Sequence, residues 1–158
     1  MSNYSNTFLK DKEYSERWEN FFAEKLGYNT NHVKGDDHGV DLTKHERIID
    51  VKAYRPPIHG EYKGFFIETW LPLSNMVGWF MDNSKLNNGY ILVKDAKTES
   101  YEYDKAWMIT KYDLSQAVAE ARRDAKDAGL KDLEVKKTPS GWGIILEYKY
   151  VAKYGVEV

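Results

Sequence analysis

Residues 39–54, GVDLTKHERIIDVKAY, constrain the fold more than any other stretch of this chain. They read as two short strands, Val40–Thr43 and Arg47–Tyr54, joined by a charged turn at Lys44–Glu46. Each strand carries an aspartate among its apolar residues, and the second strand also has a lysine two places further on. Valine would suit these positions better if the strands only had to fill a core. The stretch predicts either a surface hairpin with solvated charges or a β-hairpin whose charges serve a second purpose.

The charged residues of this hairpin are expected to gather on one side of the sheet. Asp50 and Lys52 are two residues apart, so they point to the same side. Ile49 and Val51 point to the other side, towards a helix. If the turn is tight, Asp41 lies near Asp50 on the neighbouring strand. Two such carboxylates repel each other unless one is protonated or a cation lies between them, so the pattern favours a cation site.

Mg²⁺ is the cation that this group of residues favours, with Mn²⁺ as a substitute. Asp41 and Asp50 would supply carboxylate oxygens, and the backbone carbonyl of Val51 could coordinate the metal as well. Lys52 beside the metal could hold or deprotonate a water nucleophile, or stabilise negative charge on a phosphate. This combination suits the hydrolysis of a phosphodiester.

The remaining apolar runs predict an α/β fold, one mixed sheet with helices packed on it, in a single domain over residues 1–158. The first helix, residues 11–26, has an apolar face and ends at Gly27. The later elements are expected, in chain order, as a strand at 64–70, a helix at 73–83, strands at 90–94 and 106–110, a helix near 114–128 capped by Asp113 or Ser115, and a C-terminal hairpin of 132–138 with 142–154.

Composition limits the classes of function and partner. The chain has 23 Lys and Arg against 25 Asp and Glu, so net charge does not argue for nucleic acid. A DNA partner would require a local basic rim or a bound cation. The sequence contains no cysteine, which excludes disulfides and thiolate metal sites and fits a reducing cytoplasm. No apolar run approaches the ~20 residues of a membrane span, so a membrane partner is not expected.

The motif "GVD", followed nine residues later by "IIDVKA", resembles the PD-(D/E)XK nuclease superfamily. Asp41 matches the first aspartate, Asp50 the acidic position and Lys52 the lysine, while Val40 replaces the proline. The resemblance covers about residues 11–95 and implies a restriction-endonuclease-like fold with an α-β-β-β-α-β core, here with a C-terminal helix and β-hairpin. The segments "FFIET" and "VGWF" resemble phage and bacterial members, which implies the cytoplasm of a bacterium or of a phage-infected host.

The resemblance also implies a glutamate from the N-terminal helix as a further metal ligand. Glu19 lies at the border of the apolar face of that helix and is better placed to lean towards the sheet. Glu16 is the alternative, because the family spacing to the glycine that ends the helix can favour it. Either residue could instead be an ordinary solvated carboxylate. The prediction favours Glu19 and keeps Glu16 open.

Further candidates lie around this motif. Glu68 stands in an aromatic strand, where a carboxylate needs a partner. It could pair with Lys52, line a DNA path or contact a second metal, and ordinary solvation at a sheet edge is equally consistent. The candidate DNA-binding residues are near the motif in sequence and could form the basic rim: Lys34, His38, Arg55 and Lys63.

These observations predict a Mg²⁺-dependent DNA endonuclease. A chain of 158 residues has little room for a separate sequence-reading domain, which favours structure-selective cleavage of the Holliday-junction-resolvase kind. Cutting both strands requires two matched incisions, so a homodimer is expected. The alternatives are a compact, sequence-specific restriction or homing-type endonuclease, and a non-catalytic module that binds DNA or protein on the same fold.

Overall fold

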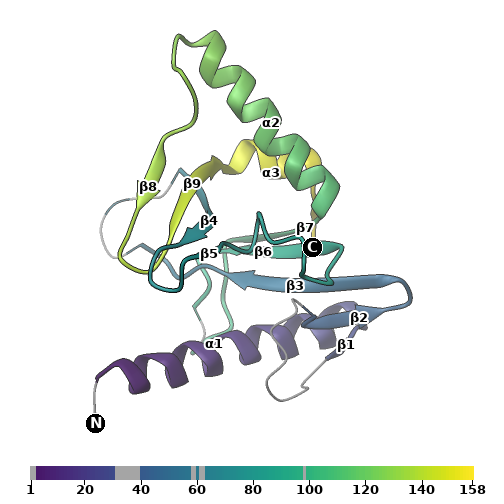
Figure 1. Ribbon diagram of the computed structural model, residues 1–158. Helices are drawn as coiled ribbons and strands as arrows, with labels where there is room; N and C mark the ends of the chain where they lie inside the picture. The colour runs from purple at the N-terminus through teal and green to yellow at the C-terminus, as the bar shows by residue number, and fades with distance from the viewer. Residues whose placement is uncertain (1–2, 31–39, 58–59, 61–62, 98) are drawn as a thin grey trace.

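The computed structural model describes residues 3–30, 40–57, 60, 63–97 and 99–158, with side chains in the first helix from residue 13 onwards. Within this part the protein is a mixed α/β structure of three helices and two sheets (Figure 1). The helices are α1 (Asn3–Leu26), α2 (Lys111–Asp127) and α3 (Tyr148–Tyr154). No helix in the described ranges is long and apolar enough to cross a membrane.

A six-stranded sheet forms the centre of the molecule. Its strands lie in the order β1 (Asn29–Thr30), β2 (Leu42–Lys44), β3 (Arg47–Ala53), β6 (Gly89–Lys94), β7 (Lys105–Thr110) and β10 (Val156–Glu157). The β2–β3 hairpin predicted from the sequence is present, with Leu42 opposite Ile49. β6 runs parallel to β3, whereas all other neighbours in this sheet are antiparallel. The predicted mixed sheet therefore exists around the candidate residues.

A second sheet contradicts the expectation that all strands share one sheet. It is antiparallel and has the order β5 (Met76–Val77), β4 (Gly64–Leu71), β9 (Trp142–Glu147) and β8 (Val135–Lys137). The physical reason is that β2 and β6 occupy both edges of β3, so β4 cannot pair there. β4 pairs instead with β9, and the predicted C-terminal hairpin is confirmed as β8–β9. Its second run leaves the sheet at Tyr148 and continues as α3.

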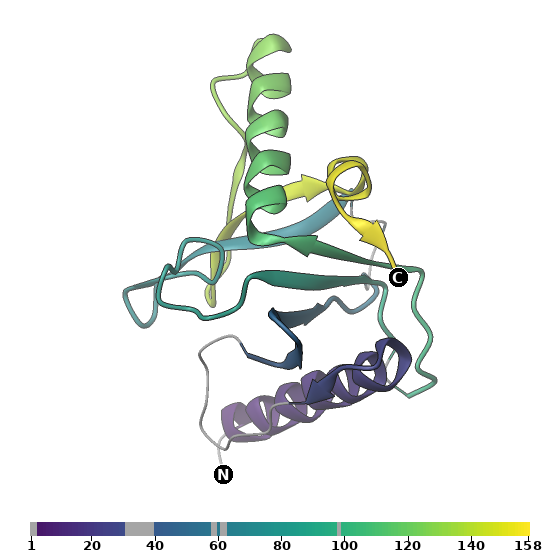
Figure 2. The same cartoon turned by 90° about the vertical axis from the view of Figure 1, so that its right-hand side faces the viewer.

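The two sheets and α1 form layers with a separate core on each side of the six-stranded sheet (Figure 2). On one side, Trp18 and Phe22 of α1 pack against Leu42, Ile49 and Val51. The other side is covered by the second sheet, α2 and α3. The largest fully buried side chains of its core are Phe65, Ile67, Tyr90, Leu92, Ile109, Leu114 and Leu146. As predicted, Ile49 and Val51 face a helix. Asp50 and Lys52 therefore lie on the face that the second sheet covers.

Two helix predictions need correction. The predicted helix at 73–83 is absent, because this segment consists of turns and the short strand β5. Gly78 lies directly on β4, where a β-carbon would come within 2.6 Å of the backbone of Glu68, and its N–H donates to the carbonyl of Thr69 at 2.8 Å. The segment at 73–83 therefore forms backbone hydrogen bonds with β4 instead of the internal hydrogen bonds of a helix. In α2 the cap is Thr110, whose hydroxyl accepts from the N–H of Asp113, because the helix begins immediately after β7.

Candidate metal and catalytic site

Three carboxylates meet where α1 lies beside the β2–β3 hairpin. Asp41 directly precedes β2, and its backbone N–H donates to the carbonyl of Ile49 at 3.0 Å. Its side-chain Oδ2 accepts from the N–H of Val51 at 2.7 Å. Asp41 therefore ends the backbone pairing of β2 with β3 and places its carboxylate at the edge of β3 that continues beyond β2. The tight turn that the sequence predicted brings Asp41 next to Asp50.

The helix contributes Glu19 to this cluster. Asp41 is hydrogen-bonded to both Glu19 and Asp50. Glu19 is 9% exposed and Asp50 is 7% exposed, which makes them two of the most buried charged residues of the described chain. Glu16 is exposed on α1 and influences Glu19 only through its charge. The geometry therefore brings Glu19, and not Glu16, into contact with the aspartates. We call Glu19, Asp41 and Asp50 the carboxylate cluster.

The electrostatics of the carboxylate cluster favour an added proton or cation. Burial raises the pKa of Glu19 to about 7, and the charge of Asp50 acts in the same direction. Burial raises the pKa of Asp41 to about 9, supported by the charge of Asp50 and the hydrogen bond to it. Carboxylate oxygens only accept hydrogen bonds, so at least one member must keep a proton, and its pKa assigns this proton to Asp41. Asp41 therefore ionises at neutral pH only when a cation compensates its charge.

The donor set of the cluster suits Mg²⁺. The N–H of Val51 and the carbonyl of Ile49 both point to the β2 edge of β3, so the carbonyl of Val51 points to that edge too. Three carboxylates and one carbonyl are hard oxygen ligands of the kind that Mg²⁺ and Mn²⁺ take. Among the described residues, no three acidic or histidine side chains already enclose a metal position. The fit is therefore one of ligand chemistry.

Lys52 lies next to the cluster in a defined orientation. Its Nζ is 3.1 Å from Oδ2 of Asp50 and 5.2 Å from the ring centroid of Trp79. The Lys52 side chain is 28% exposed, compared with 10% for that of Asp50, so the ammonium lies at the solvent side of the cluster. An ammonium held by a carboxylate and an aromatic face is preorganised to act on an anionic group that approaches from solvent.

Glu68 of β4 reaches the same region from the second sheet. Burial raises the pKa of Glu68, whereas the charge of Lys52 and a hydrogen bond from the backbone N–H of Trp79 lower it. A β-carbon on Gly141, in the turn between β8 and β9, would lie 2.8 Å from Oε2 of Glu68. Glu68 therefore lies close enough to Lys52 for their charges to interact, and the β8–β9 turn lies against its carboxylate.

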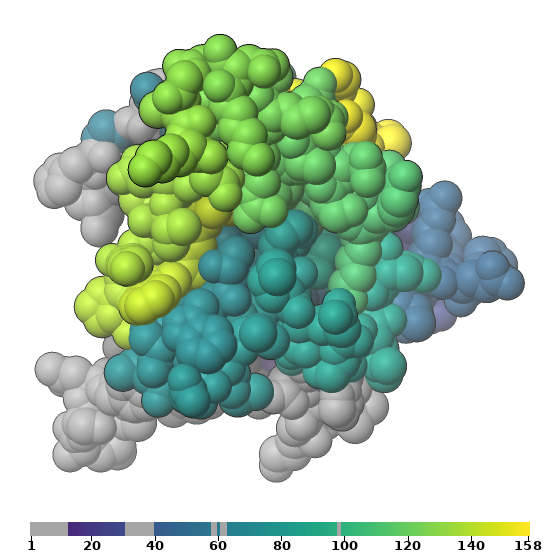
Figure 3. Space-filling view, turned by 45° about the horizontal axis from the view of Figure 1, so that its top comes forward, coloured from purple at the N-terminus to yellow at the C-terminus, as the bar shows by residue number. Residues whose placement is uncertain are grey.

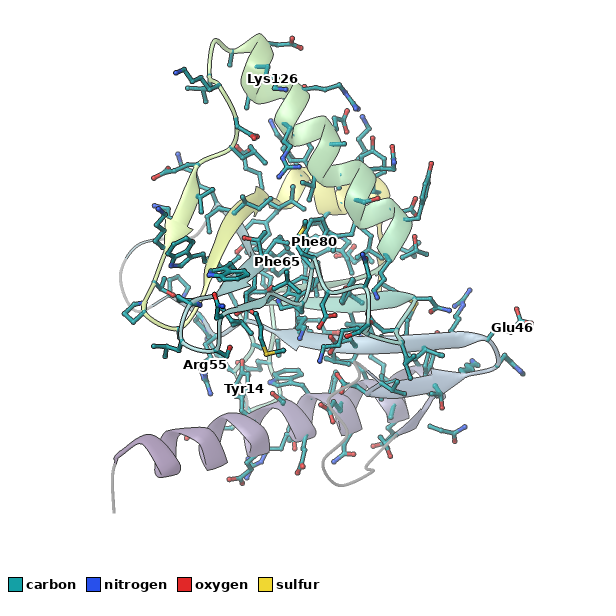
Figure 4. All side chains as sticks on the ribbon, in the orientation of Figure 1. Tyr14, Glu46, Arg55, Phe65, Phe80 and Lys126 are labelled. Atoms are coloured by element: carbon teal, nitrogen blue, oxygen red, sulfur yellow. The ribbon has the colours of Figure 1, made fainter. Side chains whose placement is uncertain are left out.

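The candidate DNA-binding residues are more dispersed. Lys34 and His38 lie outside the described residues. Arg55 follows β3, and its guanidinium carbon lies 4.1 Å from the ring centroid of Tyr14 on α1 (Figure 4). Lys63 is exposed and immediately precedes β4, about 17 Å of strand away from Glu68. The structure thus shows Arg55 against Tyr14 of α1 and Lys63 just before β4.

Sequence reasoning missed two aromatic residues that shape the site. Trp79 was assigned to a helix, but the turn segment that pairs with β4 places its ring over Lys52 and 4.9 Å from the ring of Tyr90. Tyr54 is partly buried, and its hydroxyl donates to the carbonyl of Phe66 at 2.7 Å, which ties the end of β3 to β4. The glycine before Trp79 is the one local signal of close packing. The partner of that packing is set by the tertiary structure.

No protein-family model matches the chain, and a search of curated proteins finds no significant match. The case for a function therefore rests on the carboxylate cluster, on Lys52 and on the surfaces around them.

Proposed function

We propose that the protein is a Mg²⁺-dependent DNA endonuclease of the PD-(D/E)XK type. The observation that carries the proposal is the buried carboxylate cluster with Lys52 bound to one of its members. The arrangement of α1, the β2–β3 hairpin and a strand parallel to β3 supports a restriction-endonuclease-like core. The turns at 73–83 and the separate sheet of β4 depart from the expected α-β-β-β-α-β order. The proposed setting is the cytoplasm of a bacterium or of a phage-infected host.

The chemistry follows from the positions of the side chains. Glu19, Asp41, Asp50 and the carbonyl of Val51 would hold Mg²⁺, which supplies Lewis acidity and an activated water when bound. The ammonium of Lys52 is directed by Asp50 and Trp79 towards the solvent side of the cluster. There it would donate to the attacking water or to a non-bridging phosphate oxygen, and so stabilise the charge that develops as one P–O bond forms and another breaks.

We further propose that the endonuclease acts as a homodimer on branched DNA. Five of the ten large apolar side chains that are exposed in the described chain belong to one segment: Leu73, Met76, Val77, Met81 and Leu86. The same segment carries Trp79 to Lys52. An apolar surface of this kind is typical of an interaction site, and two copies would supply the paired incisions that a four-way junction requires.

The test is cleavage of labelled four-way junctions, linear duplexes and single strands with Mg²⁺, Mn²⁺ or Ca²⁺. We expect Mg²⁺ and Mn²⁺ to support cleavage, with paired cuts in the junction and weaker cutting of linear duplex. Preference for one duplex sequence would indicate a restriction or homing-type enzyme. DNA binding without cleavage under any of these cations would identify a non-catalytic module and overturn the proposal.

Trp79→Leu is expected to lower kcat about 10-fold with little change in KM, because the ring that orients the ammonium of Lys52 is lost. Trp79→Phe should recover part of the rate, since it keeps an aromatic face. Trp142→Leu is the matched control, because Lys137 lies 4.5 Å from the ring centroid of Trp142 outside the site. Equal rate losses in Trp79→Leu and Trp142→Leu, measured in steady-state kinetics, would contradict this role for Trp79.

A further inference from the structure

A pocket of about 310 Å³ lies beside the candidate site, between the 80–83 segment, β6 and the first turn of α2. Phe80, Asp82, Tyr90, Lys111 and Ser115 are among the residues that line it. Figure 3 shows the face of the molecule on which the segment before β6 meets α2. None of the residues that line the pocket belongs to the carboxylate cluster, so the pocket needs an explanation of its own.

The register of the six-stranded sheet connects this pocket to Asp50. Asp50 of β3 is the partner of Tyr90 on β6, and Tyr90 is the partner of Ile109 on β7. Partner residues project from the same face of a sheet, so Asp50, Tyr90 and Ile109 follow one another across one face. Lys111 begins α2 two residues after Ile109, and it lines the pocket together with Tyr90. Two strand spacings separate β3 from β7, which amounts to about 10 Å.

Lys111 gives the pocket a positive charge. Its Nζ donates to the carbonyl of Lys85 at 3.2 Å, and no carboxylate of the described residues forms an ion pair with it. The ammonium has three donors, so it retains hydrogen-bonding capacity towards the pocket. Asp82 also lines the pocket, but its Oδ1 accepts from the N–H and the hydroxyl of Ser84 at 2.9 and 2.6 Å. Burial lowers the pKa of Lys111, which is consistent with a partly dehydrated cation.

We infer that this pocket binds a second phosphate group of the DNA substrate through Lys111. The inference rests on the proposed endonuclease function, because it places the scissile phosphate at the carboxylate cluster. A DNA strand carries one phosphate per nucleotide, so a phosphate other than the scissile one can lie at the pocket while the scissile phosphate lies at the carboxylate cluster. The bound group is either an internal phosphodiester or a terminal phosphomonoester. Holding it would fix the position of the strand relative to Lys52 and Asp50.

The test combines a charge-removing variant with substrates that each lack one phosphate charge. Junction DNA with a neutral methylphosphonate at single positions around the cut is cleaved by wild type, Lys111→Gln, Lys111→Arg and Lys126→Gln. We expect one methylphosphonate position to slow wild type about 10-fold, and Lys111→Gln to slow cleavage of unmodified DNA by a similar factor. Lys111→Gln should be insensitive to that modification. Lys111→Arg should retain most of the sensitivity, because it keeps the positive charge.

Lys126→Gln is the matched control, since Lys126 is an exposed lysine at the far end of the same helix (Figure 4). It should behave as wild type in every assay. Thermal unfolding of Lys111→Gln shows whether the variant is folded, and Lys111→Met provides a second neutral side chain. DNA binding is measured by fluorescence anisotropy in Ca²⁺ at several salt concentrations. The slope of log K against log salt concentration should become shallower by about one unit in Lys111→Gln alone.

The outcomes separate the inference from the function on which it rests. An unchanged methylphosphonate pattern in an active Lys111→Gln enzyme would overturn the phosphate site and leave the endonuclease proposal intact. If the wild type binds DNA without cutting it, the same comparison of substrates is made on Kd. If the wild type neither cuts nor binds DNA, both the endonuclease proposal and the phosphate site are overturned. Cleavage of substrates with and without a 5′ phosphate distinguishes an internal phosphodiester from a terminal phosphomonoester. If the cleavage rate depends on the 5′ phosphate, the pocket binds the end of a strand.

Discussion

Asp50→Asn and Lys52→Ala are each expected to reduce DNA cleavage by about 10³-fold or more, because the proposed mechanism uses Asp50 to hold the metal and Lys52 to stabilise the reacting phosphate. Asp50 would supply a buried ligand oxygen, and it also orients the lysine at 3.1 Å. Lys52 supplies the positive charge at the solvent side of the cluster. Single-turnover cleavage of a labelled junction measures the effect on chemistry apart from binding. Anisotropy in Ca²⁺ should show nearly unchanged DNA affinity for both variants.

The chain offers a matched control for this experiment. Lys94 of β6 forms an ion pair with Asp104 at 2.7 Å, and its side chain is 25% exposed, close to the 28% of Lys52. Lys94→Ala therefore removes a lysine of similar exposure from an ion pair with a more exposed aspartate, away from the carboxylate cluster. It should cut DNA at the rate of the wild type. Normal cleavage by Lys52→Ala and Asp50→Asn would remove the catalytic assignment of this site.

Without divalent cations, the unfolding temperature should fall as the pH rises from about 5 to about 9. In the unfolded chain Glu19 and Asp41 ionise near their ordinary pKa values of 4.5 and 3.8. In the folded protein they keep their protons until about 7 and about 9. Between these limits the folded state binds more protons than the unfolded state, so rising pH favours unfolding. The loss is complete once the pH has passed the folded-state values, as calorimetric scans at several pH values would show.

On the proposed function Mg²⁺ should reverse this loss, because it would bind the ionised cluster of the folded state alone. At pH 8 and a concentration about 100 times Kd, it should raise Tm by roughly 5–10 °C. Asp41→Asn should be more stable than the wild type at pH 8 in the absence of metal, and should show little Mg²⁺ shift. Asp104→Asn, at an exposed ion pair, should keep the wild-type response. An equal Mg²⁺ shift in Asp41→Asn would assign the cation to another part of the protein.

Local patterns predicted the parts of the fold that depend on neighbours in sequence. Alternation along β3 places Asp50 and Lys52 on one face and Ile49 and Val51 on the other. The apolar arc of α1 identifies Trp18 and Phe22 as core residues, which are both fully buried. The pattern failed at 73–83, where the residues compatible with a helix instead pair with β4 across Gly78. Helical periodicity does not reveal that a segment has a strand edge available to it.

The sequence by itself determined the β2–β3 hairpin and the side of it on which the charges lie, since the two-residue period of a strand leaves no other arrangement. Only the tertiary structure decided that Glu19, rather than Glu16, meets Asp41, because that depends on how α1 rotates and packs against the sheet. It also decided that Trp79 covers Lys52 and that Lys111 shares a pocket with Tyr90, the partner of Asp50. These contacts join residues that are far apart in the chain, and their free energy comes from burial between layers, which a local pattern does not encode.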